Sequence, residues 1–269
     1  MKFYTNLYLQ ELTAHKKGLI GWSIGMILMV AGGMSKYQGY KQAGESVNDF
    51  MAGMPEGVLA VFGGGQLDLT QAVWFYALIF LYLLIMGAIH SAMLGAELIA
   101  KEERDNTCEF LYVNPISRTD IITAKLLAGV TNLVVLNLVT LVSSLLIVEA
   151  FNDGDSVTNQ IFLMMIGLFF VQIIFLSIGM ASAAVVKKPK LVSPIATGFM
   201  LSTFFLSMYI KIKGDYEWLQ YFTPFHYFDG ETIVKDNALN PTFIVLSIGI
   251  IIFMFSFTYF VFNKRDLNT

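Results

Sequence analysis

The sequence predicts an all-α membrane protein with six transmembrane helices, and two observations carry this prediction. Hydrophobic residues make up 56% of the chain and charged residues only 14%, whereas soluble domains have about 25% charged residues. The apolar residues also gather in six runs, each near or above the roughly 17–25 residues with which a helix crosses a bilayer. We treat residues 1–269 as one transmembrane domain.

Composition also excludes several classes of function. The net charge of −3 leaves no dense basic face, so we expect no binding to nucleic acid. A single cysteine, Cys108, excludes an internal disulfide and a Cys-cluster metal site. The first apolar run starts only near Gly18 and no small-residue cleavage site follows it, so we expect no cleavable signal.

The first element, residues 2–16, is an amphipathic helix by its spacing. Its apolar positions recur at helical intervals, with polar residues such as Gln10 and Glu11 on the other side. Such a helix is expected to lie in the membrane interface rather than to cross it. His15, Lys16 and Lys17 then mark the headgroup level.

The six predicted spans follow in order. Their expected bounds are 18–34, 72–96, 121–148, 161–186, 191–210 and 242–262. Five of the six prolines fall between these runs, and Pro194 falls in the expected first turn of the fifth, where a proline costs least. The proline positions therefore agree with six helices.

Basic residues predict the orientation of the spans. With both termini in the cytoplasm, 12 of the 17 Lys and Arg residues lie on the cytoplasmic side and five lie outside. Lys and Arg are enriched in cytoplasmic loops. We therefore expect a multi-pass protein of the cell membrane with cytoplasmic N- and C-termini, and with segments 35–71 and 211–241 outside.

The two outer segments carry different signals. Residues 35–71 are rich in glycine but contain enough apolar residues to predict short helices packed on the outer surface. Residues 211–241 contain seven aromatic residues between Tyr216 and Phe228, and Thr223 before Pro224 is typical of a helix N-cap with proline at the first helical position. An aromatic belt at the membrane interface would explain the same residues.

A polar segment interrupts the hydrophobic chain between the second and third spans. Residues 97–125 hold ten of the chain's 37 Asp, Glu, Lys and Arg residues. Asn106 with Glu109 has the form of a capping box, and Ser117 with Asp120 repeats it after Pro115. The pattern predicts a short helix, a turn and a new helix start. An ordinary capped cytoplasmic loop is the alternative.

A set of residues in this segment resembles a motif of the permeases of type-2 (type V) ABC exporters, which are transmembrane subunits of bacterial ABC transporters. The matching residues are Glu97, Glu102, Thr107, Glu109, Leu111, Pro115, Ser117, Arg118, Ile121 and Lys125. Asn106 stands where glycine is usual in the family, and Asn also tolerates turn geometry. The resemblance implies an N-terminal elbow helix over 2–16, a cytoplasmic coupling helix near 107–113, and short re-entrant helices at 223–229 that close the outer end of a pathway.

The resemblance also implies how the chain obtains energy. In the family, the coupling helix contacts a separate nucleotide-binding subunit. The expected docking residues are Glu97, Glu102, Thr107, Glu109, Phe110, Leu111, Pro115 and Arg118. Of these, Phe110 and Leu111 are expected to insert as apolar side chains, with Glu102, Glu109 and Arg118 as polar contacts that fix the orientation.

Four polar residues lie within the predicted spans, namely His90, Asn132, Asn137 and Gln172. Unsatisfied polar groups are costly in hydrocarbon. Hydrogen bonding between helices explains such residues. The alternative is that they line a substrate pathway between two permease subunits. A metal site is not expected, because no second His or Cys is near His90 in sequence.

Enzymatic motifs are missing from the sequence. There is no His-Glu-x-x-His, no Gly-x-Ser-x-Gly and no Walker A loop, so we expect ATP and Mg²⁺ to bind a partner ATPase and this chain to need no cofactor. The expected partners are ABC ATPase subunits, a second copy or a sister permease, and the lipid bilayer. A peptide or a lipid-like or drug-like amphipathic molecule is the expected substrate of export.

Two other classes of function remain open from the sequence. A secondary transporter or channel would need intramembrane carboxylates for ion coupling, and the six predicted spans contain none. A membrane regulatory or assembly subunit would dock to an ATPase without transporting anything.

Overall fold

The computed structural model describes residues 2–44, 46, 49–50, 53–55, 58–59, 68–105, 117–154, 156–213 and 217–264. These residues form helices and turns, and none of them is in a strand. The helices are α1 (Lys2–Met34), α2 (Tyr37–Ala43), α5 (Ala72–Arg104), α7 (Arg118–Phe151), α8 (Thr158–Val185), α9 (Pro189–Lys213), the 3₁₀ helix η1 (Glu217–Phe222), α10 (Pro224–Tyr227), α11 (Gly230–Asp236) and α12 (Pro241–Lys264).

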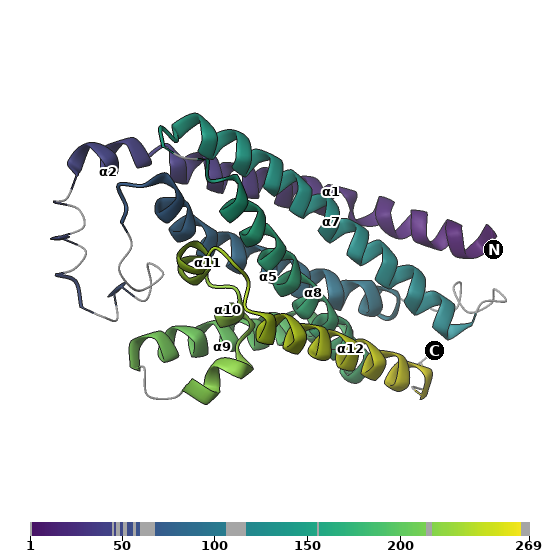
Figure 1. Cartoon of the computed structure of the whole chain (residues 1–269). Coiled ribbons are helices and arrows are strands. Elements are labelled where there is room, and N and C mark those ends of the chain that lie inside the picture. The colour runs from purple at the N-terminus through teal and green to yellow at the C-terminus, as the bar shows by residue number, and fades with distance from the viewer. Residues whose placement is uncertain are drawn as a thin grey trace.

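Six of these helices are long and apolar enough to cross a membrane, which confirms the six predicted spans. They are α1, α5, α7, α8, α9 and α12. Figure 1 shows them as an elongated bundle, with the N-terminus and the last turns of α12 at the same end. We call this the terminal end; the opposite end, which carries α2, α10 and α11, is the far end.

The helices extend beyond the predicted spans. Helix α5 continues to Arg104 instead of ending at Ala96, and α7 begins at Arg118 rather than at Ile121. Hydropathy marks only the part of a helix that suits hydrocarbon, while capping fixes where the helix itself begins. Ser117 provides the predicted cap of α7, since its Oγ accepts a hydrogen bond from the backbone N–H of Asp120 at 3.1 Å.

Pro194 lies deeper in its helix than the sequence predicted. The fifth span, α9, starts at Pro189, so Pro194 lies inside the helix rather than in its first turn. Pro189 itself occupies the start of α9, where its missing N–H costs nothing. The helix therefore begins two residues before the predicted span, in a polar stretch that contains Lys190.

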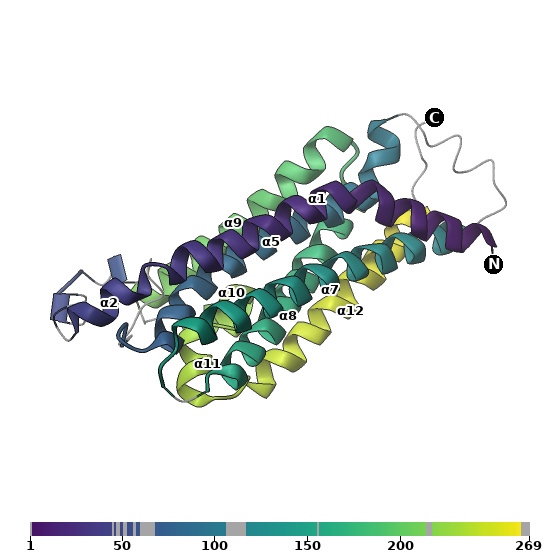
Figure 2. The ribbon, with the colours of Figure 1, turned by 90° about the horizontal axis from the view of Figure 1, so that it is seen from above.

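The predicted elbow segment is helical, but it is not a separate element. Residues 2–16 continue into the first span as one helix, α1, with no break at Lys17. Figure 2 shows α1 running alongside α7. Leu7 packs with Ile121 and Ala124 of α7, and the Tyr8 and Thr131 hydroxyls share a hydrogen bond of 3.0 Å. The interfacial position of residues 2–16 stays a prediction.

Helices α5 and α8 form the centre of the bundle. Their backbones approach so closely that a Cβ at Gly95 would lie 2.2 Å from the carbonyl oxygen of Leu176. A Cβ at Gly179 would lie 2.4 Å from the carbonyl oxygen of Ala92. Small residues allow this packing in membranes, where helices associate by van der Waals contact rather than by the hydrophobic effect.

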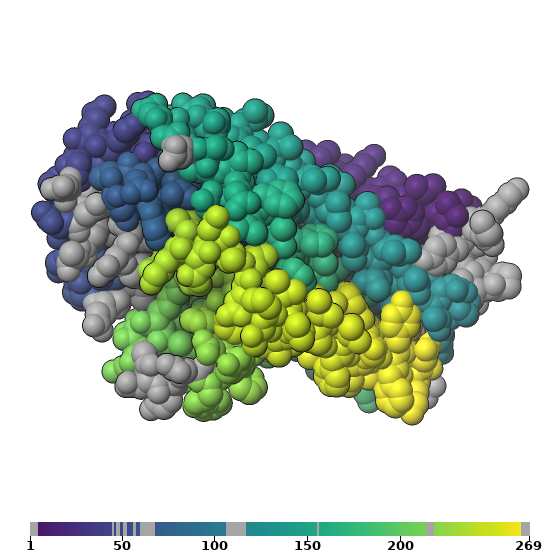
Figure 3. Space-filling model, in the orientation of Figure 1, coloured from purple at the N-terminus to yellow at the C-terminus, as the bar shows by residue number. Residues whose placement is uncertain are grey.

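Helix α12 lies on the outside of the bundle, and Figure 3 shows it uncovered along its length. Its exposed side chains are large and apolar, among them Val245, Ile252 and Phe260. Apolar residues exposed on this scale suit contact with lipid. The exposed face of α12 therefore agrees with a transmembrane helix at the rim of the subunit.

The short helices between α9 and α12 pack into the far end of the bundle. Thr223 Oγ1 accepts from the backbone N–H of His226 at 3.3 Å with Pro224 at the first helical position, which confirms the predicted cap. Phe228 stacks on Phe170 with ring centroids 5.4 Å apart, and it lies against Gly167. Gly167 is about 14 Å along α8 from its far end. These short helices thus reach well into the bundle.

Candidate functional site

The candidate docking site lies at the terminal end, where α5 ends and α7 begins. The segment that joins the two helices, residues 106–116, lies outside the described residues, and with it five of the predicted docking residues: Thr107, Glu109, Phe110, Leu111 and Pro115. The structure does describe how α5 and α7, the helices on either side of this segment, are held in place.

The last turns of α5 carry charged side chains that remain accessible. Arg104 Nη1 lies 3.7 Å from the Glu97 carboxylate, and Arg104 Nε donates to Asp105 at 3.0 Å. The side chains of Glu97, Arg104 and Asp105 are each about 40% exposed or more. Their charges are therefore free to reorganise toward a partner, since surface ion pairs contribute little stability.

The first turn of α7 is held against the end of α12. Arg118 Nη1 donates to the carbonyl oxygens of Phe262 and Asn263, each at 3.4 Å. These carbonyls end α12 and have no helical partners of their own. A cation at a helix C-terminus also interacts favourably with the helix dipole. Arg118 thus links α7 to α12 within the chain.

A buried group of charged residues connects three helices just inside this end. We call Glu11, Lys101, Glu102 and Lys125 the charge cluster; Glu11 comes from α1, Lys101 and Glu102 from α5, and Lys125 from α7. Lys125 Nζ lies 2.5 Å from Glu102 Oε1 and 3.1 Å from Glu11 Oε1. The second carboxylate oxygen of Glu11 pairs with Lys101.

Lys125 is the centre of the charge cluster. Its ammonium also donates to the carbonyl oxygen of Leu98 at 2.5 Å, so its three N–H groups have three acceptors. Lys125 and Glu11 are each only 1% exposed. A buried charge is tolerable when it is paired and hydrogen-bonded, and here two carboxylates face two ammonium groups. The charge cluster ties the helices on both sides of segment 106–116 to the N-terminal helix.

The position of Glu102 differs from the one that a docking residue would have. Its side chain is only 13% exposed and its carboxylate pairs with Lys125 inside the bundle. Sequence reasoning included Lys125 in the motif but did not connect it with Glu11. The available signal was a lone carboxylate on an otherwise uncharged helix face, and nothing in the sequence names its partner 114 positions away.

The four polar residues predicted within spans are all buried inside the subunit. Asn137 Nδ2 donates to Gln172 Oε1 at 3.3 Å and to the carbonyl oxygen of Met165 at 3.2 Å, which joins α7 to α8. His90 packs on Trp22 with ring centroids 5.4 Å apart, and Asn132 is 3% exposed. Hydrogen bonding between helices is therefore seen for Asn137, whereas His90 Nδ1, Asn132 Oδ1 and Gln172 Nε2 are buried without a hydrogen-bond partner among the described residues. A role of the four residues in lining a pathway stays a prediction.

The far end carries its own ionisable groups. Lys211 Nζ donates to Asp229 at 2.6 Å, between α9 and the residue that precedes α11. Burial lowers the pKa of His226, an effect that Asp229 opposes and Lys211 reinforces. Burial also raises the pKa of Glu231, with Asp229 adding to the rise and Lys211 and Lys235 opposing it.

Within the described residues, no three His, Cys, Asp or Glu side chains form a group suited to a metal ion.

Comparison with known proteins gives one match. A family model described as "ABC-2 family transporter protein" matches residues 5–267, which is nearly the whole chain. A search of curated proteins found no match.

Proposed function

The chain belongs to the ABC-2 family of transporter proteins and is a multi-pass transmembrane subunit of such a transporter, and from this we propose that it exports an amphipathic substrate with energy from separate ATPase subunits. ATP and Mg²⁺ would bind those subunits. In this proposal the chain supplies the pathway and the element that receives the mechanical work.

The observation that carries the proposal is the way the two helices around segment 106–116 are fixed. The charge cluster joins the end of α5 and the start of α7 to α1, and Arg118 joins α7 to α12. A push on segment 106–116 would therefore move several long helices together rather than bend a loose loop. The far end of α5 and of α7 would receive the same movement.

The docking residues divide into two groups in this proposal. Phe110 and Leu111, with Thr107, Glu109 and Pro115, would contact the ATPase, and Glu97 and Arg118 would flank that contact. Glu102 would act mainly within the charge cluster, because its carboxylate is already paired with Lys125. In sequence, Phe110 and Leu111 form an apolar pair flanked by polar residues, and interfaces favour an apolar centre with a polar rim.

The proposal places the terminal end in the cytoplasm, because the ATPase works there. The distribution of Lys and Arg supports this orientation. Cys108, the single cysteine, lies in the segment at issue. In intact cells it should react with a membrane-permeant maleimide and resist an impermeant one; the reverse pattern would place segment 106–116 outside and end the proposal.

Docking is tested by Phe110→Asp, with Phe110→Leu as the matched control that keeps an apolar side chain. We expect the Asp variant to lose co-purification with the ATPase subunit that accompanies the wild-type chain, and to lose stimulation of ATP turnover. The Leu variant should keep both. Equal thermal unfolding of the two variants shows that the fold survives. If the Asp variant binds and stimulates the ATPase like the wild type, the docking proposal is wrong.

Six spans and no nucleotide site make this chain a half-transporter in the proposal, so a second permease subunit is needed. This is a second copy or a sister chain. Cross-linking of the purified complex, followed by its mass, would distinguish one permease subunit from two.

A further inference from the structure

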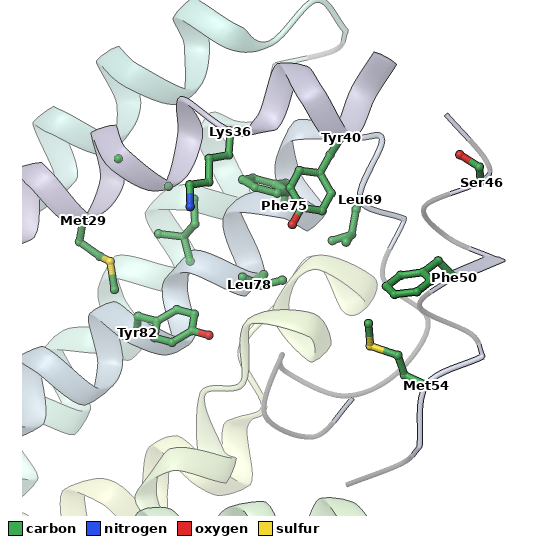
Figure 4. A pocket seen from close by; sticks show the side chains of 13 residues that line it. Met29, Lys36, Tyr40, Ser46, Phe50, Met54, Leu69, Phe75, Leu78 and Tyr82 are labelled. Atoms are coloured by element: carbon green, nitrogen blue, oxygen red, sulfur yellow. The ribbon is translucent and has the colours of Figure 1, made fainter. Parts of the chain in front are cut away.

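A cavity of about 840 Å³ opens at the far end, between α1, α5 and the segment that follows α2. Figure 4 shows its lining side chains: Met29 and Tyr82 at one side, and Phe50 and Met54 facing them from the other. Ligand sites in proteins have volumes of about 300–1,000 Å³. The cavity therefore has room for a molecule of substantial size.

The walls of the cavity are mainly apolar. Helix α5 contributes Phe75, Leu78 and Ile79, and α1 contributes Met29. Gly32 leaves the α1 wall open, because a Cβ at that position would meet no atom within 4 Å. A larger side chain at Gly32 would thus occupy cavity space rather than disturb the packing of α1 on α5.

Lys36 places a positive charge at one end of this apolar cavity. Lys36 lies in the turn between α1 and α2, and Figure 4 shows its amine directed toward the cavity. Among the described residues, no carboxylate forms an ion pair with Lys36, whereas Lys41, one turn further on, pairs with Asp153. Met29 lies about 7.5 Å along α1 from the end of the helix at Met34, and Lys36 follows two residues later. The cavity thus has a charged end and a long apolar end.

We propose that this cavity binds an anionic amphiphile with an acyl chain, with its headgroup at Lys36 and its chain between α1 and α5 toward Met29 and Tyr82. The charge complements Lys36, and the apolar walls exclude a headgroup from the deeper part. A phospholipid of the outer leaflet and a free fatty acid share this chemistry. The inference deepens the proposed function by naming a substrate class, and it rests on that function only for the placement of the far end in the outer leaflet.

Binding is measured on the full chain purified in mild detergent, by native mass spectrometry. The probes are phosphatidylglycerol, phosphatidylcholine with the same acyl chains, and oleate. We expect tighter retention of phosphatidylglycerol than of phosphatidylcholine, and oleate tells whether a single chain with a carboxylate suffices. Lys36→Met should weaken phosphatidylglycerol binding by about tenfold, the size of one charge-assisted contact, and remove the preference over phosphatidylcholine. Lys36→Arg should restore it.

A second set of variants tests whether the cavity itself is the binding site, by filling it with a larger side chain. Gly32→Leu should abolish retention of both phospholipids and of oleate. Gly21→Leu is the matched control, since Gly21 lies on the same helix, also has open space at its Cβ position, and does not line the cavity. Lys213→Met serves as the control for a lysine at the far end outside the cavity.

Two outcomes would overturn the proposal. These are equal retention of phosphatidylglycerol and phosphatidylcholine by the wild type, and retention of lipid by Gly32→Leu at the level of the wild type. The experiment needs no ATPase, so its failure leaves docking untouched. Conversely, loss of docking in Phe110→Asp should leave lipid retention as it is.

Discussion

The two ends of the same pair of helices are built in opposite ways. At the terminal end, α1 and α5 contribute Glu11, Lys101 and Glu102 to the charge cluster, in which Lys125 pairs with Glu11 and Glu102. At the far end, the same two helices line an apolar cavity with Lys36 at its edge. About 30 Å of α5 separates Tyr82 from Glu102, which is the thickness of the hydrocarbon core.

This difference indicates how the chain separates two tasks. Buried ion pairs have demanding geometry, so they hold helices in one register. An apolar cavity has few directional contacts, so it tolerates movement and different occupants. A movement delivered to the charge cluster would thus be transmitted along α1 and α5 as rigid elements and would change the shape of the cavity.

Lys125→Met should have the largest effect on stability, because it removes the centre of the charge cluster. The substitution removes the closer cation of Glu102, whose side chain is 13% exposed, and leaves Lys101 Nζ at 4.0 Å. Breaking a buried ion pair costs about 3–5 kcal/mol. Thermal unfolding in detergent, followed by tryptophan fluorescence, measures the loss. Lys188→Met is the matched control, an exposed lysine at the same end. Equal melting temperatures for both variants would mean that the charge cluster does not hold the helices.

Glu11→Gln should have a smaller effect, because Lys125 keeps Glu102 and the Leu98 carbonyl as acceptors. We expect the free energy of unfolding to fall by about 1–3 kcal/mol. The amide oxygen of the new side chain can still accept one of the two hydrogen bonds that the Glu11 carboxylate accepts from Lys101 and Lys125. A double-mutant cycle with Lys125→Met isolates the pair, since residues in one network are not additive. If the double variant loses as much free energy of unfolding as the two single variants together, Glu11 and Lys125 do not interact. Helix α1 is then not held to α7 through this pair.

Asn137→Leu separates packing from transport in the middle of the bundle. The substitution removes the hydrogen bond to Gln172 between α7 and α8, and such bonds in membrane proteins are worth about 0.6–2 kcal/mol. We expect a modest drop in the melting temperature and an unchanged dependence of ATP turnover on substrate concentration. A change in that dependence with an unchanged melting temperature would instead place Asn137 on the pathway.

Much of the fold followed from the sequence because its signals are local. Six apolar runs give six helices, and Ser117 with Asp120 and Thr223 with Pro224 mark helix starts that the structure confirms. Where the helices differ from the predicted spans, the reason is also local. Hydropathy falls before a helix ends, so α5 and α7 extend beyond the apolar runs, and α1 continues through the charged end of the elbow segment.

The site was less predictable, because its contacts join distant parts of the chain. Glu11 meets Lys125 only because α1 runs beside α7, and helix pairing cannot be derived from hydropathy. The cavity likewise depends on how three separate segments of the chain come together, because residues from all three line it. The docking residues between 106 and 116 lie outside the described residues, so their role stays a prediction that rests on the motif.

The smallest effect is expected from Lys41→Met, which removes an ion pair at the far end. Lys41 pairs with Asp153, but the two side chains are 39% and 82% exposed, and pairs in water contribute little because solvent and salt screen them. We expect no measurable change in the melting temperature, in contrast to Lys125→Met, although both variants lose one lysine from an ion pair. A loss comparable with that of Lys125→Met would show that the far end is held as firmly as the terminal end. The contrast between a fixed end and an adaptable one would then fail, because an ion pair from α2 would hold the far end as the charge cluster holds the terminal end.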